Sequence, residues 1–428
     1  MTSLRCAFIA VCVPALLSGQ AADSVRLGAL QVSAIQHDPR LRELDLLARQ
    51  SRNRLQNIDA ERRPALSVES QAQYQSDVAH IQLALPGVSI PTPAHDTYDA
   101  HLGAQQKLFD PTTAARRSLE SAQLAESEAR LRVVLYPVRQ RVNDAFFAAL
   151  RAQLQVAEMQ TTLTDLEAQR DAAARRVREG SALPSEELIL RAELLRRRQG
   201  VSELRASERA ALDVLRELTG SSIDTSATLA VPGVDERAAL RLAQDERQRP
   251  EYAQFALSRE LLQRQEDLRG TQDKPRISAF GRAGYGRPGL NPLSDKFGTY
   301  WLAGMQLQWT PFNWGTTDRD RETLTLQRQV IDAEVESFTQ ALRTAVAQDR
   351  ATVDRLTAAL ASDDEIVNLR DAVLAEFRAR FTEGVITSAE YVDRQTDALG
   401  ARIARAQHRA ELAQANAHFL TTLGLEVR

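Results

Sequence analysis

The sequence of 428 residues contains only 2 cysteines, Cys6 and Cys12, and both lie near its start. Residues 1–22 read as a secretory signal peptide, because Arg5 supplies a positive charge, residues 6–17 are apolar, and small residues follow. An exported protein loses such a segment, so we expect a mature chain without cysteine. Disulfide bonds, thiolate metal sites and cysteine nucleophiles are then excluded.

Long hydrophobic runs are also missing. After residue 22, no stretch approaches the roughly 18–20 consecutive apolar residues that a transmembrane helix needs. An exported chain of this kind is soluble in the periplasm, secreted, or inserted in a membrane as a β-barrel. The net charge of −3 gives no reason to expect a nucleic-acid partner.

Recognisable catalytic motifs are lacking as well. Residues 284–289 match the dinucleotide pattern G-x-G-x-x-G, but Pro288 and Pro292 prevent a helix from starting there, so we expect a turn. The 6 histidines show no metal-ligand spacing, and there is no P-loop or Gly-x-Ser-x-Gly elbow. We therefore predict that the protein is not an enzyme and has no cofactor and no metal site.

What the sequence does contain is an internal duplication. Four landmarks occur in both halves in the same order and with nearly constant spacing. They are two prolines, an aromatic junction and a Glu-Gly pair, which place Pro39 opposite Pro250, Pro64 opposite Pro275, Phe109 opposite Phe312, and Gly180 opposite Gly384. We predict a first repeat at 23–220, a linker at 221–234 and a second repeat at 235–428.

Each repeat begins with a helix, continues with a strand–loop–strand segment, and ends with a long helical hairpin. The predicted segments are 25–61, 64–109 and 112–219 in the first repeat, and 235–271, 275–312 and 316–424 in the second. Few glycine and only 5% aromatic residues, with 26% charged residues, also favour long solvated helices over a large sheet.

The long helices are predicted from the absence of helix breakers. Between Gly315 and Gly384 there is neither glycine nor proline, and a helix of roughly 70 residues spans on the order of 100 Å. Apolar residues recur every three or four positions over 331–360, with a charged interruption at Asp349, which is typical of a coiled-coil seam. Pro137 should kink or break the corresponding helix of the first half.

Four segments of about 10 residues alternate between apolar and polar side chains, as tilted transmembrane strands do. Phe280 is the one break that we note in this alternation. The polar loop at 77–96 is expected to be extracellular. Aromatic residues near the segment ends fit interfacial girdles: Tyr74, Tyr98, Tyr285, Trp301 and Trp309.

Alternation alone would also fit two hairpins on a soluble core. The charged polar faces and the great length of the helices favour membrane strands instead. Four strands cannot close a barrel in lipid, where every edge group must be paired. Several chains must then pool their strands, and a trimer would supply twelve.

In these features the sequence resembles the TolC-like outer membrane efflux protein family, also called outer membrane factors. The proline-led strand pairs, the junctions at Phe109 and Phe312 and the Glu-Gly tips carry the resemblance over essentially the whole mature chain. It implies a mainly α fold with a small β component: a homotrimer with a 12-stranded β-barrel in the lipid of the cell outer membrane and an α-helical periplasmic tunnel (an α-barrel). It also implies a periplasmic adaptor protein and an inner-membrane pump of the RND or ABC type.

The resemblance further implies where the site lies. In that family, acidic residues just beyond the second tip constrict the tunnel entrance, and the matching positions are Glu390 and Asp393. Rings of carboxylates would favour cations, although acidic residues also suit the first turn of any helix. The tips would contact the adaptor or serve simply as turns, and their residues are Gly180, Ser181, Gly384 and Val385.

We therefore predict an outer-membrane channel that passively conducts substrates from an adaptor and pump to the exterior. The alternative from another class is a soluble periplasmic coiled-coil scaffold that binds other proteins through its hairpins. Within the channel class, the alternative is a duct for type I protein secretion. Drugs, metal ions and polypeptides stay open as cargo, because the pump and the adaptor choose the substrate.

Overall fold

The structure is a computed structural model that describes residues 25–79, 92–232, 248–291 and 294–426. The predicted signal peptide lies outside the described residues, as do parts of the predicted loop at 77–96, linker at 221–234 and helix at 235–271. The described chain divides into two compact units. We call them the sheet unit (38–137 and 244–346) and the hairpin unit (residues up to 37, 138–243 and 347–428), and we describe each by itself.

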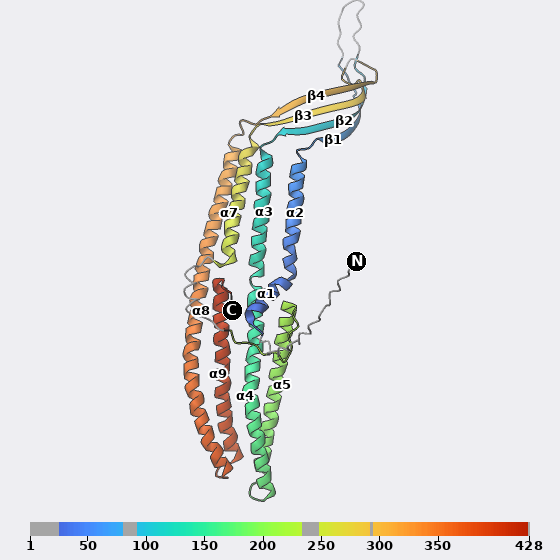
Figure 1. Cartoon of the computed structure of the whole chain (residues 1–428). Helices are drawn as coiled ribbons and strands as arrows, with labels where there is room; N and C mark the ends of the chain where they lie inside the picture. The colour runs from blue at the N-terminus through green and yellow to red at the C-terminus, as the bar shows by residue number, and fades with distance from the viewer. Residues whose placement is uncertain (1–24, 80–91, 233–247, 292–293, 427–428) are drawn as a thin grey trace, which may run out of the picture. The chain divides into compact units, whose positions relative to one another are not determined.

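The sheet unit contains one antiparallel sheet and the helices that lead into and out of it (Figure 1). The strands lie in the order β1-β2-β3-β4, so β1 and β4 form the two edges of the described sheet. The elements are η1 (Pro39–Leu41), α2 (Arg42–Ala60), β1 (Ala65–Tyr74), β2 (Asp96–Phe109), α3 (Thr112–Leu135), α7 (Pro250–Gln272), β3 (Arg276–Arg287), β4 (Gly298–Gln308) and the first part of α8 (Thr316–Thr382).

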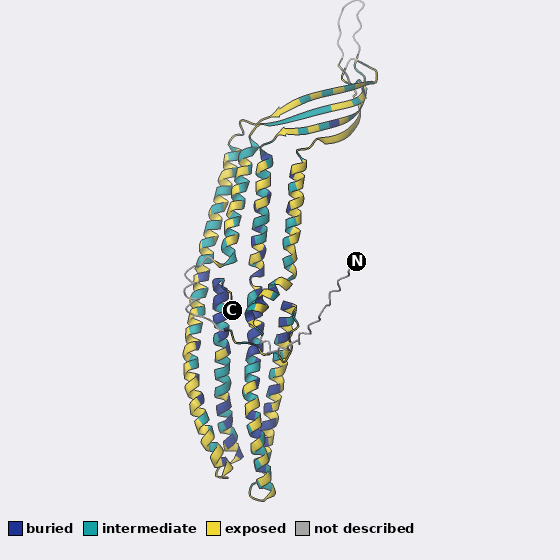
Figure 2. Ribbon diagram, viewed as in Figure 1, coloured by how far each residue is buried: buried dark blue, intermediate teal, exposed yellow. Residues whose placement is uncertain are grey.

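The hairpin unit is helical and holds most of the buried apolar side chains (Figure 2). Its core includes Phe146, Phe147 and Leu150 of α4, which are all fully or almost fully buried. The elements are α1 (Leu27–His37), α4 (Val138–Arg178), α5 (Pro184–Thr219), the second part of α8, and α9 (Ser388–Leu423). Among the described residues, no helix is both long enough and apolar enough to cross a membrane.

The duplication predicted from the sequence is visible in the order of the elements. Helix, strand pair, long helix and returning helix occur twice, with α2, β1, β2, α3–α4 and α5 matched by α7, β3, β4, α8 and α9. The halves differ at Pro137, where α3 ends and α4 begins, because proline removes a backbone donor and clashes with the preceding turn. The matching helix α8 has no proline and runs unbroken for 67 residues.

Glycine ends the long helices at both hairpin turns. Gly180 and Gly384 have φ angles of 72° and 76°, a left-handed conformation that residues with a Cβ atom adopt at a cost. The two turns have the same hydrogen bonds: the N–H of Ser181 donates to the carbonyl of Arg176, and that of Val385 to Arg380. The predicted tips are therefore confirmed as turns.

Candidate functional site

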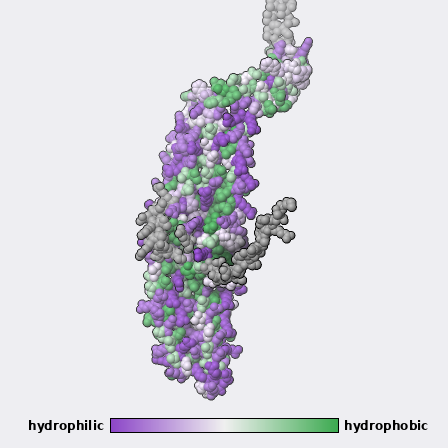
Figure 3. All heavy atoms as spheres, viewed as in Figure 1, coloured by the Kyte–Doolittle hydropathy of each residue, from purple (hydrophilic) through white to green (hydrophobic). Residues whose placement is uncertain are grey.

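The strand register gives the sheet one apolar and one polar face. Val68 pairs with Leu102, Leu102 with Ala283, and Ala283 with Trp301, so one apolar row crosses all four strands. Side chains in this face are uncovered: Val68 is 82% exposed and Trp301 is 76% exposed. A contiguous apolar surface of this kind marks an interaction with a partner or a membrane. Figure 3 shows hydrophobic residues over part of the sheet in this view.

The neighbouring row of the sheet is polar. It consists of Glu69, His101, Gly284 and Tyr300, which are register partners from β1 to β4. Phe280 lies on this face too, and its ring covers Gly304 of β4, where a Cβ atom would lie only 2.8 Å from the ring. The break in the alternation that we predicted at Phe280 therefore fills a space that glycine leaves open.

The five predicted girdle aromatics are all exposed. Tyr74, Tyr98 and Tyr285 lie near the loop end of the sheet, and Phe297 stacks on the last two, with ring centroids 6.0 and 5.5 Å apart. Trp301 lies near the start of β4, while Trp309 follows its end, where the chain approaches α8.

Two further aromatic residues lie beside Trp309 in sequence and were not predicted as interface residues. Phe312 and Trp314 pack edge to face with centroids 4.9 Å apart, and they are 67% and 79% exposed. Trp314 has a φ of 56°, which is uncommon for a residue other than glycine. Their signal in the sequence was the aromatic junction, which we used as a landmark of the duplication and of the family resemblance but not as a sign of a membrane interface.

The two predicted gate residues differ in their surroundings. Glu390 forms a capping box with Thr387, in which its carboxylate accepts from the Thr387 N–H at 2.9 Å and the Thr387 hydroxyl caps the Glu390 N–H at 3.2 Å. The Thr387 N–H lowers the pKa of Glu390, and its hydroxyl adds to this effect. Asp393 is exposed and makes no ion pair or side-chain hydrogen bond within the described chain.

The predicted tip residues Gly180, Ser181, Gly384 and Val385 are all exposed. Next to them, Leu183 and Val385 present large apolar side chains to solvent. The Ser388 N–H donates to Glu186 at 2.5 Å, so the beginnings of α9 and α5 are in contact. The two hairpin tips therefore lie next to each other.

Just above the tips, Asp165 of α4 joins three side chains of the second hairpin. Its carboxylate accepts from the Tyr391 hydroxyl at 2.5 Å and from the Gln395 amide at 2.8 Å, and it pairs with Arg378. Tyr391 is fully buried, and burial, with help from Asp165, raises the pKa of its phenol. No local pattern in the sequence points to Asp165.

Tyr391 also belongs to an apolar cluster that connects the two hairpins. It stacks on Phe381 with ring centroids 5.0 Å apart. The guanidinium of Arg176 lies over the Phe381 ring, 4.8 Å from its centroid. The cluster consists of Leu166, Ala173, Leu190, Leu194, Phe381 and Tyr391. The two hairpins are thus held together by apolar packing and by Asp165.

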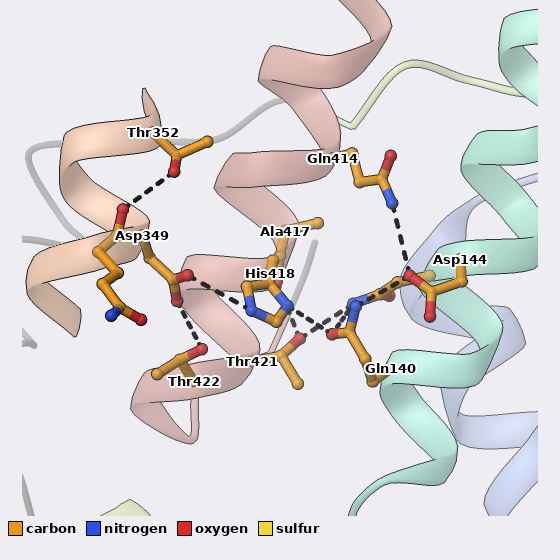
Figure 4. Close-up of polar contacts among 11 residues, drawn as sticks. Gln140, Asp144, Asp349, Thr352, Gln414, Ala417, His418, Thr421 and Thr422 are labelled. Carbon is orange, nitrogen blue, oxygen red and sulfur yellow. Dashed lines mark hydrogen bonds and ion pairs between the residues drawn. The ribbon is translucent and has the colours of Figure 1, made fainter. Parts of the chain in front are cut away.

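A second polar network lies far from the tips along α9 (Figure 4). His418 faces Asp349 of α8 at 3.4 Å and the Gln140 amide oxygen of α4 at 2.9 Å. Thr422 donates to Asp349 at 2.7 Å. Asp349, the charged interruption in the predicted seam, is therefore a polar contact between α8 and α9. Among the described residues, no group of acidic and histidine side chains is arranged as a metal site.

Two of three comparisons with known proteins find similar proteins. Residues 242–425 match the family model of the outer membrane efflux proteins. No curated protein sequence matches the chain.

Several solved structures are similar to this one. CusC, whose crystal structures concern transmembrane channel formation, is 17% identical with a TM-score of 0.68, over 93% of this chain and 92% of its own. VceC of Vibrio cholerae is 16% identical with a TM-score of 0.65, over 94% and 97%. The MtrE outer membrane channel of Neisseria gonorrhoeae is 18% identical with a TM-score of 0.64, over 94% and 90%. At these identities the likeness shows the fold.

Proposed function

We propose that this chain is a TolC-like outer membrane efflux protein and the outer-membrane channel subunit of a tripartite efflux or export system, because residues 242–425 match the family model of the outer membrane efflux proteins and the fold is similar to those of CusC and VceC. In this role it conducts substrates passively. The energy comes from an inner-membrane pump of the RND or ABC type, and a periplasmic adaptor joins the pump to the channel.

The open edges of the sheet require several copies of the chain to join, and we propose a homotrimer, as in the family that the chain resembles. Four strands leave unpaired backbone groups on β1 and β4 of the described sheet, and a bilayer offers no water to satisfy them. Because β1 and β4 are antiparallel, β4 of one copy can pair with β1 of the next without a change of direction. Three copies then close a barrel of twelve strands.

The two faces of the sheet determine which side of the barrel wall faces lipid and which side faces the lumen. The exposed apolar row with Val68 and Trp301 faces lipid, where its side chains are removed from water. The polar row with Glu69 and His101 then faces the lumen. Aromatic side chains at both ends of the strands, including Tyr98 and Trp309, lie in the two membrane interfaces. The long hairpins form the periplasmic tunnel.

The hairpin ends are the docking surface for the adaptor and the entrance of the tunnel. Leu183 and Val385 are the exposed apolar contacts that support the first role. For the second role, Asp393 offers a free carboxylate, whereas Glu390 also stabilises the start of α9. Opening of the entrance separates α9 from α4 and breaks the contacts of Asp165.

The observation that carries this proposal is the uncovered apolar face of a sheet that remains open at both edges. The full chain, expressed with its signal segment, should appear in the outer-membrane fraction and require detergent for release. The purified protein should produce discrete conductance steps in planar lipid bilayers. Recovery in the osmotic-shock supernatant without detergent would instead favour a soluble scaffold, and that result would overturn the proposal.

A further inference from the structure

The turn between β4 and α8 holds an exposed tryptophan in an unfavourable backbone conformation. Trp314 has a φ of 56°, and of the described residues other than glycine it alone has a positive φ. A residue with a Cβ atom adopts this left-handed conformation at a cost, so glycine is the usual residue there. Because Trp314 is 79% exposed, packing inside this chain does not offset the cost. A strained and exposed side chain of this kind indicates a contact outside the chain.

Hydrogen bonds on both sides of Trp314 fix the turn. The side chain of Asn313 accepts from the Gly315 N–H at 3.1 Å and donates to the Asp273 carboxylate at 2.8 Å. Asp273 follows the last residue of α7, so the turn is tied to the end of that helix. The guanidinium of Arg319 donates to the Trp314 carbonyl at 3.1 Å. The indole is therefore presented to its surroundings from a fixed position.

Trp314 and its neighbour Phe312 follow directly on an uncovered apolar strand face. Met305, Leu307 and Trp309 alternate along β4 and just beyond its end, and all three are more than half exposed. Phe312 and Trp314, which pack edge to face, come next and are also largely exposed. A run of exposed apolar side chains therefore continues from the strand into the turn.

The matching end of β2 has a surface of the same kind. β2 and β4 run in the same direction, because each is antiparallel to β3, so both end at the same side of the sheet. Leu108 and Phe109 are the last residues of β2, and both are exposed. Apolar and aromatic residues gather at this end on two strands that are not neighbours. This distribution suits a bilayer, which meets every strand, better than one protein partner.

A tryptophan side chain combines a large apolar ring with a polar N–H, and such rings gather between the hydrocarbon and the headgroups of a bilayer. We propose that Phe312 and Trp314 form a membrane anchor that binds the headgroup region of the periplasmic leaflet. The strained turn holds the indole at that depth and thereby fixes where α8 leaves the membrane. This inference rests on the proposed channel function, and it adds an anchor in the turn to the five predicted girdle residues.

The test uses the intrinsic fluorescence of the full-length protein in lipid vesicles. The chain has 3 tryptophans, so Trp301→Phe combined with Trp309→Phe leaves only Trp314. The vesicles consist of phosphatidylcholine with bromine either close to the headgroups or close to the ends of the acyl chains. Bromine close to the headgroups should quench Trp314 about twice as strongly as bromine at the chain ends. Discrete conductance steps in planar bilayers confirm that the variant is folded.

A matched variant separates this inference from the proposed function. Trp309→Phe combined with Trp314→Phe leaves only Trp301, which lies in the exposed apolar row of the sheet. Loss of all quenching for Trp301 would overturn the membrane orientation of the sheet itself. Quenching of Trp301 without quenching of Trp314 would leave the channel in place and overturn the anchor. Stronger quenching of Trp314 from the chain ends would also contradict the anchor, because the ring would then lie in the hydrocarbon.

A further variant tests the turn. In the protein that retains only Trp314, Asn313→Ala removes the hydrogen bonds to Gly315 and Asp273. The indole is then no longer held in place, so quenching from the headgroup side should fall by about half and the emission should shift to longer wavelength. Asn368→Ala, at an exposed position of α8, is the control and should change neither. Equal quenching in both variants would show that the turn does not position the tryptophan.

Discussion

The two helical hairpins occupy matching positions in the two repeats, but they are built differently. In the first, α4 and α5 pack closely through apolar side chains such as Leu166, Leu190 and Leu194. In the second, α9 packs against α4 of the first hairpin, and charged side chains join it to its own hairpin partner α8. The first hairpin therefore contains its own core, and the second depends on the first.

Charged side chains connect α8 and α9 at several places along their length. Five pairs join the two helices, and each is an aspartate with a histidine or arginine: Asp349 with His418, Asp363 with His408, Asp364 with Arg405, Asp371 with Arg402, and Asp397 with Arg370. Most of these pairs are partly exposed, and partly exposed ion pairs contribute little stability. We infer that α8 is the helix of the hairpin unit that separates most easily from its neighbours.

The largest loss of stability is expected when a buried ion pair of the first hairpin is broken. Glu193 and Arg197 are each about nine-tenths buried and lie 2.5 Å apart, and Arg197 also donates to Thr396 of α9. Glu193→Gln leaves the guanidinium without its counter-charge, so we expect a loss of about 4 kcal/mol in the free energy of unfolding. Denaturant unfolding of the purified protein would measure it, with the exposed Glu203→Gln as the control.

This effect should depend on pH in one direction. Burial alone would raise the pKa of Glu193, but the hydrogen bond from Arg196 and the charges of Arg197 and Arg196 outweigh it and hold the pKa below its ordinary value. The stabilisation is then present above the pKa of the unfolded chain, and it is lost as the pH falls through the folded-state pKa. The difference between wild type and Glu193→Gln should shrink in acid, and a difference that grows in acid would contradict this assignment.

Truncation of an apolar core side chain in the first hairpin should cause the second-largest loss of stability. Leu190 is completely buried in the cluster with Leu166 and Tyr391, so Leu190→Ala should lower the free energy of unfolding by about 3 kcal/mol. Leu188→Ala, two residues away on the same helix, removes an exposed side chain and is the matched control. Equal effects of the two variants would show that the first hairpin has no core of its own.

Removal of the hydrogen bond that joins the two hairpins should lower the stability less, but it should change the single-channel conductance. Tyr391→Phe removes the hydroxyl that donates to Asp165 and keeps the stack on Phe381. We expect a loss of about 1 kcal/mol and a larger single-channel conductance, because α9 is held less firmly to α4. Tyr252→Phe removes a similar hydroxyl contact, with Thr339 in the sheet unit, and should leave the conductance unchanged.

The acidic residues that begin the returning helices offer another comparison between the hairpins. Asp393→Asn should raise the single-channel conductance about twofold and weaken the block by divalent cations, if a ring of carboxylates narrows the entrance. Glu390→Gln removes a charge while glutamine can still complete the capping box. Glu187→Gln, in the first turn of α5, is the control from the first hairpin. An unchanged conductance in both Asp393→Asn and Glu390→Gln would remove these residues from the gate.

The smallest effect is expected at the charge pairs of the second hairpin. Arg402 donates twice to Asp371, at 2.8 and 3.0 Å, yet Asp371→Asn should cost less than about 1 kcal/mol because the pair is partly exposed. A double-mutant cycle with Arg402→Gln in low and high salt would measure the coupling, which should fall as salt rises. A coupling above 2 kcal/mol that salt leaves unchanged would show that α8 is held as firmly as α5.

Local patterns in the sequence predicted the elements and the faces of the strands well. The break at Pro137, the turns at Gly180 and Gly384 and the period-two alternation around Leu102 each follow from short-range chemistry, and the structure confirms them. The capping box was also readable, because Thr387 and Glu390 have the spacing of that motif. We considered only the charge of Glu390 and missed its role in starting α9.

The contacts between distant elements could not be predicted in this way. Periodicity shows that one side of α9 is buried, but it does not identify α4 as the helix that covers it. Asp165 and Tyr391 are 226 positions apart, and neither has a local pattern that points to the other. The same holds for His101, whose partner Glu69 becomes its neighbour only through the strand register.

The central claim is that β4 of one copy pairs with β1 of the next. Since the mature chain is expected to contain no cysteine, pairs of new cysteines can test this directly in native membranes, with one on β1 (Leu66→Cys, Val68→Cys or Ala72→Cys) and one on β4 (Ala303→Cys, Met305→Cys or Leu307→Cys). Within one chain β2 and β3 separate these positions. The account predicts that at least one pair yields, on oxidation, a ladder that ends at three covalently linked copies, and that single-cysteine variants yield none. Absence of cross-linking throughout the panel, or a ladder that continues beyond three copies, would contradict it.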